Sequence, residues 1–133
     1  MTEFRCVATD AVVVDDDEIL LLERNHEPYK GSWVLPGGMV ERNETVREAC
    51  RRETREEVGI EVDVESRVGV FDGVDRDPRG NVSIAYRCSP VNSGAEPREE
   101  ARSVEWFDPC ELSKDGLGFD HGRIVRDGMR TGI

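Results

Sequence analysis

The sequence predicts a layered domain of the α/β or α+β class. Three observations predict it: several runs of β-branched and aliphatic residues at strand length, one capped helix near the middle of the chain, and an amphipathic segment near its end. The 133 residues are enough for one domain with its own core, so we expect a single domain over residues 1–133.

The first part of the chain predicts three extended segments. Residues 4–14 are rich in β-branched side chains and residues 19–22 read Ile-Leu-Leu-Leu, so the acidic residues 15–18 between them are expected to form a hairpin turn. Residues 33–35 form a short third segment. Pro36-Gly37-Gly38 then predicts a tight turn, because Pro presets φ and Gly accepts a positive φ.

A helix is expected to begin after Thr45. Thr45 and Glu48 have the spacing of a capping box, and Gly59 stands where a left-handed C-cap is expected. Between the caps runs an apolar stripe that includes Ala49 and Cys50, so one side of this helix is expected to face the core.

The second half of the chain predicts three more strands and a final helix. Strands, a helix, further strands and a second helix are the order of a layered α/β or α+β domain. The expected elements are strands over residues 62–71, 82–88 and 103–107, a short helical turn over 109–112 and a helix over 122–130.

Three glutamates crowd one face of the predicted first helix, at the end of its apolar stripe. Glu53, Glu56 and Glu57 stand at i, i+3 and i+4, where like charges repel. A carboxylate cluster that faces the core is costly unless it is paired or binds a cation, and carboxylate oxygens suit a hard divalent cation. For the triplet alone, a solvated glutamate-rich helix is the alternative interpretation.

The pattern around this triplet is longer and more specific. Residues 38–60 read Gly, five residues, Glu, seven residues, Arg-Glu, and then Glu-Glu and Gly-Ile at fixed spacing. This segment resembles the signature, or box, of the Nudix hydrolases. The sequence departs from it only at Thr54, where the family has an apolar residue, and the threonine methyl group can still pack. The resemblance implies an α/β/α sandwich around a mixed β-sheet.

The same resemblance implies an enzyme, a Nudix pyrophosphohydrolase. Its members cleave a nucleoside diphosphate linked to another moiety by attack of water on phosphorus, and they require Mg²⁺ or Mn²⁺. The match implies that Glu53, Glu56, Glu57 and the backbone carbonyl of Gly38 are the metal ligands. It also makes Glu53 the first candidate for activating the water, with Glu57 as the second essential acid.

Further residues are expected to support this site. By the same match, Glu44 and Arg52 orient the acids through hydrogen bonds. In several family members an acid from a distant loop serves as base or ligand, and Glu99 or Glu100 could do so here; a solvated loop is the alternative for both.

Two less specific segments bear on the substrate. Residues 75–86 and 118–121 resemble stretches of the ADP-ribose pyrophosphatases, which favours hydrolysis of ADP-ribose to AMP and ribose 5-phosphate. Sanitation of nucleoside triphosphates by a MutT-like pyrophosphohydrolase is one alternative. A catalytically silent nucleotide-binding module is another. His121 is expected to be a residue at the start of the last helix, near the core, rather than a catalyst.

The remaining substrate contacts are expected from side-chain chemistry. Arg24 and Arg79 suit phosphate, because a guanidinium group binds oxyanions through two parallel hydrogen bonds. Trp33 or Tyr29 could stack on adenine, with ordinary packing as the alternative for each.

The charge of the chain bears on its partners. A net charge of −11 disfavours nucleic acid and anionic membrane surfaces, so the expected partner is a small nucleotide. No apolar run is long enough to span a membrane, and the first residues lack the apolar run of a signal peptide, so a cytoplasmic location is expected. Monomer and homodimer remain open. The four cysteines form no C-x-x-C pair and are expected to be buried free thiols rather than a zinc site.

The basic residues are sixteen arginines and two lysines. An acidic, lysine-poor chain suggests adaptation to a high-salt cytoplasm, where salt screens the repulsion between carboxylates. An acidic protein from an arginine-rich genome is the alternative. Equal thermal stability in dilute buffer and in molar salt would rule out the salt adaptation.

Overall fold

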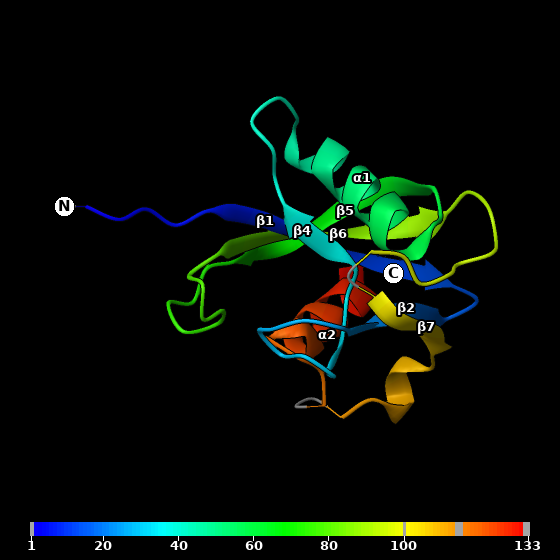
Figure 1. The fold of residues 1–133 in the computed structure, drawn as a ribbon. Helices are drawn as coiled ribbons and strands as arrows, with labels where there is room; N and C mark the ends of the chain where they lie inside the picture. Colours follow the sequence, from blue (N-terminus) through cyan, green and yellow to red (C-terminus); the bar gives the residue numbers. More distant parts are fainter. Residues whose placement is uncertain (1, 100, 114–115, 132–133) are drawn as a thin grey trace.

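The computed structural model describes residues 2–99, 101–113 and 116–131, which fold into a sheet with helices on both faces (Figure 1). This confirms the predicted class, a mixed sheet in an α/β/α arrangement. In chain order the elements are β1 (Val7–Asp15), β2 (Glu18–Arg24), β3 (Trp33–Val34), β4 (Gly37–Met39), α1 (Val46–Val58), β5 (Val62–Phe71), β6 (Val82–Pro90), β7 (Ala101–Phe107), the 3₁₀ helix η1 (Pro109–Glu111) and α2 (His121–Thr131).

The strand β1 changes partners along its length. The sheet order is β3-β2-β1-β6-β5, with β4 added on β1 and β7 on β2. Among the strand pairs of the described residues, only β1–β6 is parallel. The first half of β1 pairs with β4, whereas only its last residues, Val14 and Asp15, pair with β2. The strands β4 and β2 therefore lie beside different parts of β1.

Successive side chains of β1 point to opposite faces of the sheet and pack in a separate core on each face. Ala11 and Val13 pack in the core that also contains Cys50 of α1, whereas Val12 packs with Ile124 of α2. The side chains of Val12, Val13 and Ile124 are fully buried. The two helices thus cover opposite faces, α1 above and α2 below the sheet in Figure 1.

The ends of α1 agree with the prediction. Thr45 accepts a hydrogen bond from the amide of Glu48, the carboxylate of Glu48 accepts one from the amide of Thr45, and Gly59 has φ 74°. Thr54, the departure from the family signature, is fully buried, and its hydroxyl group donates to the carbonyl oxygen of Cys50 at 2.7 Å. A buried threonine here therefore keeps its hydroxyl group satisfied.

The prediction of a tight turn at Pro36-Gly37-Gly38 is wrong. Gly37–Met39 is the strand β4, and neither glycine is among those with a positive φ. These positions need space instead. A Cβ atom at Gly37 would collide with the backbone of Thr9 and the carboxylate of Asp10, and one at Gly38 would lie 2.8 Å from Oε1 of Glu53.

The prediction for the cysteines holds for two of the four. Cys50 and Cys88 are buried, with their Sγ atoms 3.8 Å apart. Cys6 and Cys110 are exposed; Cys6 lies in the N-terminal arm and Cys110 in η1, which has no buried residue.

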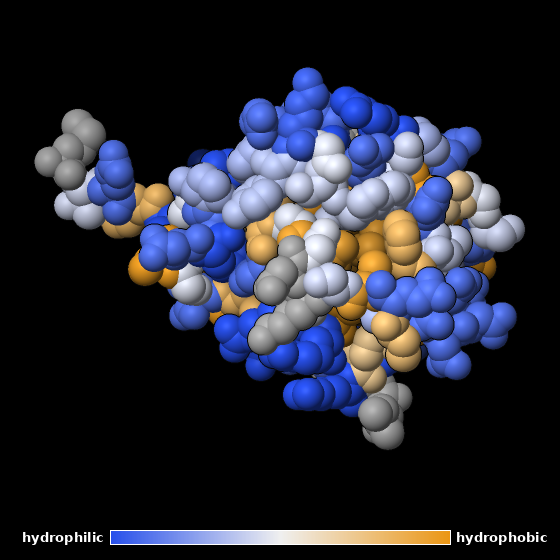
Figure 2. All heavy atoms as spheres, turned by 90° about the horizontal axis from the view of Figure 1, so that it is seen from below, coloured by the Kyte–Doolittle hydropathy of each residue, from blue (hydrophilic) through white to orange (hydrophobic). Residues whose placement is uncertain are grey.

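Hydrophobic side chains also gather on the face that lies below in Figure 1 (Figure 2). A cavity of about 400 Å³ lies there between η1 and α2, and its lining includes Leu112, Leu117, Val125 and Met129. None of the predicted site residues that the structure describes is in this lining. Within the described part of the chain, no helix has the length and apolar character needed to cross a membrane.

Candidate active site

A polar cavity of about 270 Å³ lies where β4, α1, the 75–81 loop and the start of α2 meet. Its lining combines acids with arginines, so an anionic substrate would need both the arginines and a bound cation to enter. Among the described residues the lining includes six acidic side chains, Asp10, Glu41, Glu53, Glu57, Asp77 and Glu99, and three arginines, Arg24, Arg76 and Arg79.

Glu57 ties α1 to β4. Its side chain is almost fully buried, and its Oε1 accepts a hydrogen bond of 2.8 Å from the backbone amide of Gly37. Glu57 follows Glu53 by one helical turn, so both carboxylates face β4. The two predicted acids of α1 and the strand β4 thus form one side of the cavity together.

Gly38 lies directly against the carboxylate of Glu53. A Cβ atom at position 38 would collide with both carboxylate oxygens. Only glycine therefore lets the backbone of β4 approach Glu53 this closely. The role of the Gly38 carbonyl as a metal ligand stays a prediction.

The side chain of Arg52 is hydrogen-bonded to several acids of the signature. Its Nε and Nη2 donate to the two carboxylate oxygens of Glu44 at 2.9 and 2.6 Å, and its Nη1 donates to Glu53 at 2.7 Å and to Glu56 at 3.1 Å. The hydrogen bonds to Glu44 raise the pKa of Arg52, and those from Arg52 lower the pKa of Glu44. Both groups therefore keep their charges, and Glu53 and Glu56 share one donor nitrogen.

The donor set of α1 and β4 fits a hard divalent cation. The three predicted carboxylates and the predicted backbone carbonyl would supply oxygen ligands, and the missing Cβ atom of Gly38 makes space for the carboxylate of Glu53. Within the described residues, no group of three or more acidic, histidine or cysteine side chains is arranged to hold a metal ion. Glu53 already lies against Gly38, but Glu53 and Glu56 are both hydrogen-bonded to Arg52, so a metal-binding arrangement requires these carboxylates to exchange contacts with Arg52 for contacts with the cation.

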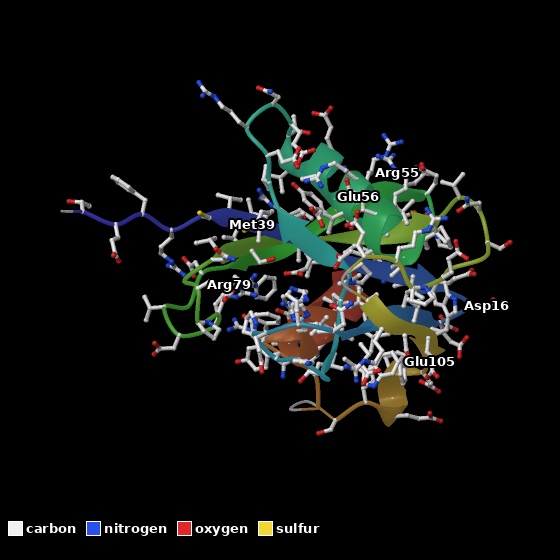
Figure 3. All side chains as sticks on the ribbon, viewed as in Figure 1. Asp16, Met39, Arg55, Glu56, Arg79 and Glu105 are labelled. Atoms are coloured by element: carbon white, nitrogen blue, oxygen red, sulfur yellow. The ribbon has the colours of Figure 1, made fainter. Side chains whose placement is uncertain are left out.

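The opposite side of the cavity carries the predicted phosphate contacts. Arg24 is buried, donates to the carbonyl oxygen of Pro28 at 2.6 Å and lies 5.2 Å from the ring centre of Phe119. Arg79 is paired with Asp77 and lies 5.5 Å from the same ring. Figure 3 shows Arg79 on the loop below β4 and Glu56 on α1 above it.

The predicted aromatic contacts are placed differently. The structure does not bring Trp33 to the cavity, because its ring packs edge-to-face on Phe107 at 5.1 Å. Tyr29 contacts Phe119 at 4.5 Å, and it is Phe119 that lines the cavity. The resemblance of residues 118–121 pointed to this segment but assigned no contact to Phe119, whose position depends on residues far away in the chain.

Glu99 and Glu100 were the two candidates for an acid from a distant loop. Glu99 lines the cavity together with Glu53 and Glu57, and the amide side chain of Asn25 donates to its backbone carbonyl at 3.0 Å. Glu100 lies outside the described residues.

Sequence reasoning missed a buried charged network below β4. Arg76 makes a two-pronged ion pair with Asp120, with distances of 2.7 and 2.9 Å. Burial by itself would raise the pKa of Asp10, but His121, Ser83 and Arg76 hold it below its usual range. The resemblance of residues 75–86 and 118–121 to ADP-ribose pyrophosphatases was the only signal that pointed to these segments.

The fold and the site together define a class of protein, a hydrolase that acts on pyrophosphate bonds. An acidic helix lies along one side of the cavity and arginines lie along the other, which suits a phosphate-rich substrate. The family model of the NUDIX domain matches residues 4–128, and the chain belongs to the NUDIX family.

Known proteins of this family are similar over most of the chain. The ADP-ribose pyrophosphatase of Methanocaldococcus jannaschii is 43% identical over 125 residues, which cover 93% of this chain and 73% of that protein. A MutT-like protein of Streptomyces ambofaciens is 36% identical over 108 residues, covering 81% and 67%. The NUDIX domain of Shewanella oneidensis NrtR, solved in complex with ADP ribose, superimposes with a TM-score of 0.85 over 99% of this chain and 91% of that one; at 20% identity this likeness concerns the fold alone.

Proposed function

We propose that this chain hydrolyses ADP-ribose to AMP and ribose 5-phosphate with the help of Mg²⁺ or Mn²⁺. The observation that carries the proposal is the placement of Glu53 and Glu57 against the β4 backbone, at the edge of a cavity that also contains Arg24 and Arg79. The similarity to the ADP-ribose pyrophosphatase of M. jannaschii supports the choice of substrate.

Each residue of the signature has a proposed task. Glu53, Glu56, Glu57 and the carbonyl oxygen of Gly38 hold the cation. When bound, the cation would neutralise negative charge on the pyrophosphate oxygens. Arg52 and Glu44 fix the directions of the carboxylates through the hydrogen bonds described above.

The chemical step needs a base and a place for the leaving phosphate. Glu53 takes a proton from the attacking water, the water oxygen forms a bond to one phosphorus, and the bridging P–O bond breaks. Glu99 lines the same cavity and is the second candidate for the base. Arg24 and Arg79 bind phosphate oxygens of the substrate and of the departing product.

The remaining proposals concern the setting of the reaction. We infer that the enzyme works in the cytoplasm, as a monomer or homodimer, on a small nucleotide rather than on nucleic acid. The net charge of −11 supports the last point, because nucleic acid would be repelled.

A substrate panel tests the proposed function. ADP-ribose, NADH, diadenosine polyphosphates and normal and oxidised nucleoside triphosphates are incubated with Mg²⁺ and with Mn²⁺, at low and at high salt, and products are separated by chromatography. We expect ADP-ribose to be hydrolysed fastest and to yield AMP and ribose 5-phosphate. A Glu57→Gln preparation, purified in the same way, controls for contaminating phosphatases.

A second candidate function is supported by the similarity to the MutT-like protein of S. ambofaciens. In that case triphosphates would be the preferred substrates and would yield a monophosphate and pyrophosphate. If no compound is hydrolysed under any condition, the proposed hydrolysis is wrong and a catalytically silent nucleotide-binding module is favoured.

A further inference from the structure

The backbone from Leu35 to Gly38 is held from three directions. The elements that hold it are α1 and α2, which lie on opposite faces of the sheet (Figure 1), and β1, which pairs with β4. This segment carries Gly38, whose carbonyl oxygen is a proposed metal ligand. Its hydrogen bonds include one to each element: from the amide of Leu35 to Nδ1 of His121 at 3.0 Å, from the amide of Ala11 to the carbonyl oxygen of Pro36 at 2.8 Å, and from the amide of Gly37 to Oε1 of Glu57 at 2.8 Å.

The hydrogen bond to Leu35 decides which nitrogen of His121 carries the proton. A backbone amide can only donate, so Nδ1 must accept and has no proton. The ring proton therefore lies on Nε2, which faces Oδ1 of Asp10 at 3.4 Å. His121 is 4% exposed, so water does not compete for either ring nitrogen.

Asp10 is itself fixed in place. Its Oδ2 accepts a hydrogen bond from the hydroxyl group of Ser83, and it stands opposite Gly37 in the pairing of β1 with β4. A Cβ atom at position 37 would collide with its carboxylate. The carboxylate that orients His121 thus also touches the segment that His121 holds.

We propose that His121 is a positioning residue for the metal site: through Asp10 it is kept in the Nε2-protonated form, and through the amide of Leu35 it fixes the strand that presents the Gly38 carbonyl. The proposal rests on the proposed function, since it assumes that β4 contributes a metal ligand. The sequence had suggested only a residue at the start of the last helix.

Two substitutions of His121 test the contacts of its two ring nitrogens one at a time. In His121→Asn, the side-chain oxygen can take the place of Nδ1 and accept from Leu35, but nothing reaches Asp10. In His121→Gln, the amide nitrogen can reach Asp10, but the acceptor for Leu35 is lost. Ile124→Val is the matched control, because Ile124 is a fully buried residue of α2 that belongs to the core below the sheet.

Binding of Mn²⁺ alone, measured by calorimetry or electron paramagnetic resonance, is the main readout. We expect His121→Gln to bind Mn²⁺ about tenfold more weakly and to exchange its Leu35 amide hydrogen faster, as is typical when a group that orients a ligand is removed. His121→Asn should stay within about threefold of wild type. Ile124→Val should lower the Tm without changing Mn²⁺ affinity.

Wild-type protein supplies an independent test that needs no variant. The ¹⁵N shifts of the His121 ring report which nitrogen is protonated, and a proton on Nδ1 would overturn the proposal. Equal Mn²⁺ affinity in wild type and His121→Gln would also overturn it. So would a loss of Mn²⁺ affinity that is proportional to the decrease in Tm in all three variants. Failure of the proposed metal site looks different, because the wild-type protein itself would then bind no Mn²⁺, and a preference for another substrate would show only in the substrate panel.

Discussion

The two sides of the active-site cavity are built in different ways. The signature wall, formed by Gly38, Glu53 and Glu57 with Arg52 behind them, comes from one strand and one helix that are adjacent in sequence. The composite wall, formed by Asp10, Arg24, Arg76, Asp77, Arg79, Phe119 and His121, comes from segments that are spread over the whole chain.

The hydrogen bonds of the two walls differ in how far apart their partners lie in the sequence. In the signature wall, Arg52 reaches Glu44 across 8 positions and Glu53 across 1. In the composite wall, Arg76 reaches Asp120 across 44 positions and Leu35 reaches His121 across 86. The helix brings the acids of the first wall together, and a hydrogen bond across 20 positions from Gly37 to Glu57 joins them to β4. The second wall exists only when the whole chain has folded. Substitutions in the first wall should therefore affect chemistry most, whereas substitutions in the ion pairs of the second wall should affect stability most.

The largest effect is expected in the signature wall. Glu57→Gln and Glu53→Gln should each lower kcat by about 100-fold or more, because a ligand or base is lost. The fold should persist, since the side-chain amide oxygen introduced by Glu57→Gln can still accept from the amide of Gly37. Steady-state hydrolysis of ADP-ribose and the Tm are the measurements. Glu105→Gln is the control, because this exposed residue lies on β7 away from the cavity (Figure 3); near wild-type rates in both the Glu53 and the Glu57 variant would refute the assignment.

The second effect tests the composite wall. Arg76→Met should lower the free energy of unfolding by about 3 kcal/mol, because the partly buried carboxylate of Asp120 loses its partner. The double variant Arg76→Met/Asp120→Leu should recover part of this loss, as both charges are then removed. Urea denaturation of the two single variants and the double variant measures the coupling. If the single effects simply add, the pair does not hold this wall together.

The contrast also explains which parts of the site the sequence could predict. Helical spacing places Glu53, Glu56 and Glu57 on one face without any knowledge of the rest of the chain, and the caps of α1 depend only on local hydrogen bonds. The resemblance to the family then assigned tasks to these residues. This part of the site was predictable because its geometry is local.

The composite wall was less predictable for the same reason. Trp33 and Phe119 are both aromatic, and only the packing of Trp33 on Phe107 and of Phe119 on Tyr29 decides which one lines the cavity. The turn at Gly37 was mispredicted because the glycines serve close approach to Asp10 and Glu53, which lie elsewhere in the chain. No local pattern contains these contacts.

The third prediction asks whether the signature wall depends on geometry or on charge. Arg52→Lys keeps the charge but loses the planar guanidinium group that joins Glu44, Glu53 and Glu56, so kcat should fall about tenfold with little change in Tm. Arg55→Lys, on the same helix with one exposed ion pair of 3.5 Å to Glu61, is the control and should stay near wild type. Equal rates in both variants would show that charge alone suffices.

The smallest effect concerns the pH dependence of the composite wall. Burial by itself would raise the pKa of Asp77, but the hydrogen bonds and charge of Arg79 bring it below its usual value of 3.8. A lowered folded-state pKa means that this contribution to stability is complete above pH 3.8 and is lost as the pH falls through the lower folded value. Because Arg79 is half-exposed, the contribution should stay within about 1 kcal/mol.

Asp77→Asn measures this contribution. The difference in unfolding free energy between wild type and Asp77→Asn, measured in urea, should narrow as the pH falls below 3.8, since a protonated carboxyl group carries no charge and in this respect matches the amide of the variant. Asp16→Asn, at an exposed position in the turn between β1 and β2 and remote from the cavity (Figure 3), is the control for the general effect of acid. A difference for Asp77→Asn that stays constant with pH would mean that the charge of Asp77 contributes nothing, and that other long-range contacts hold the 75–81 loop at the cavity.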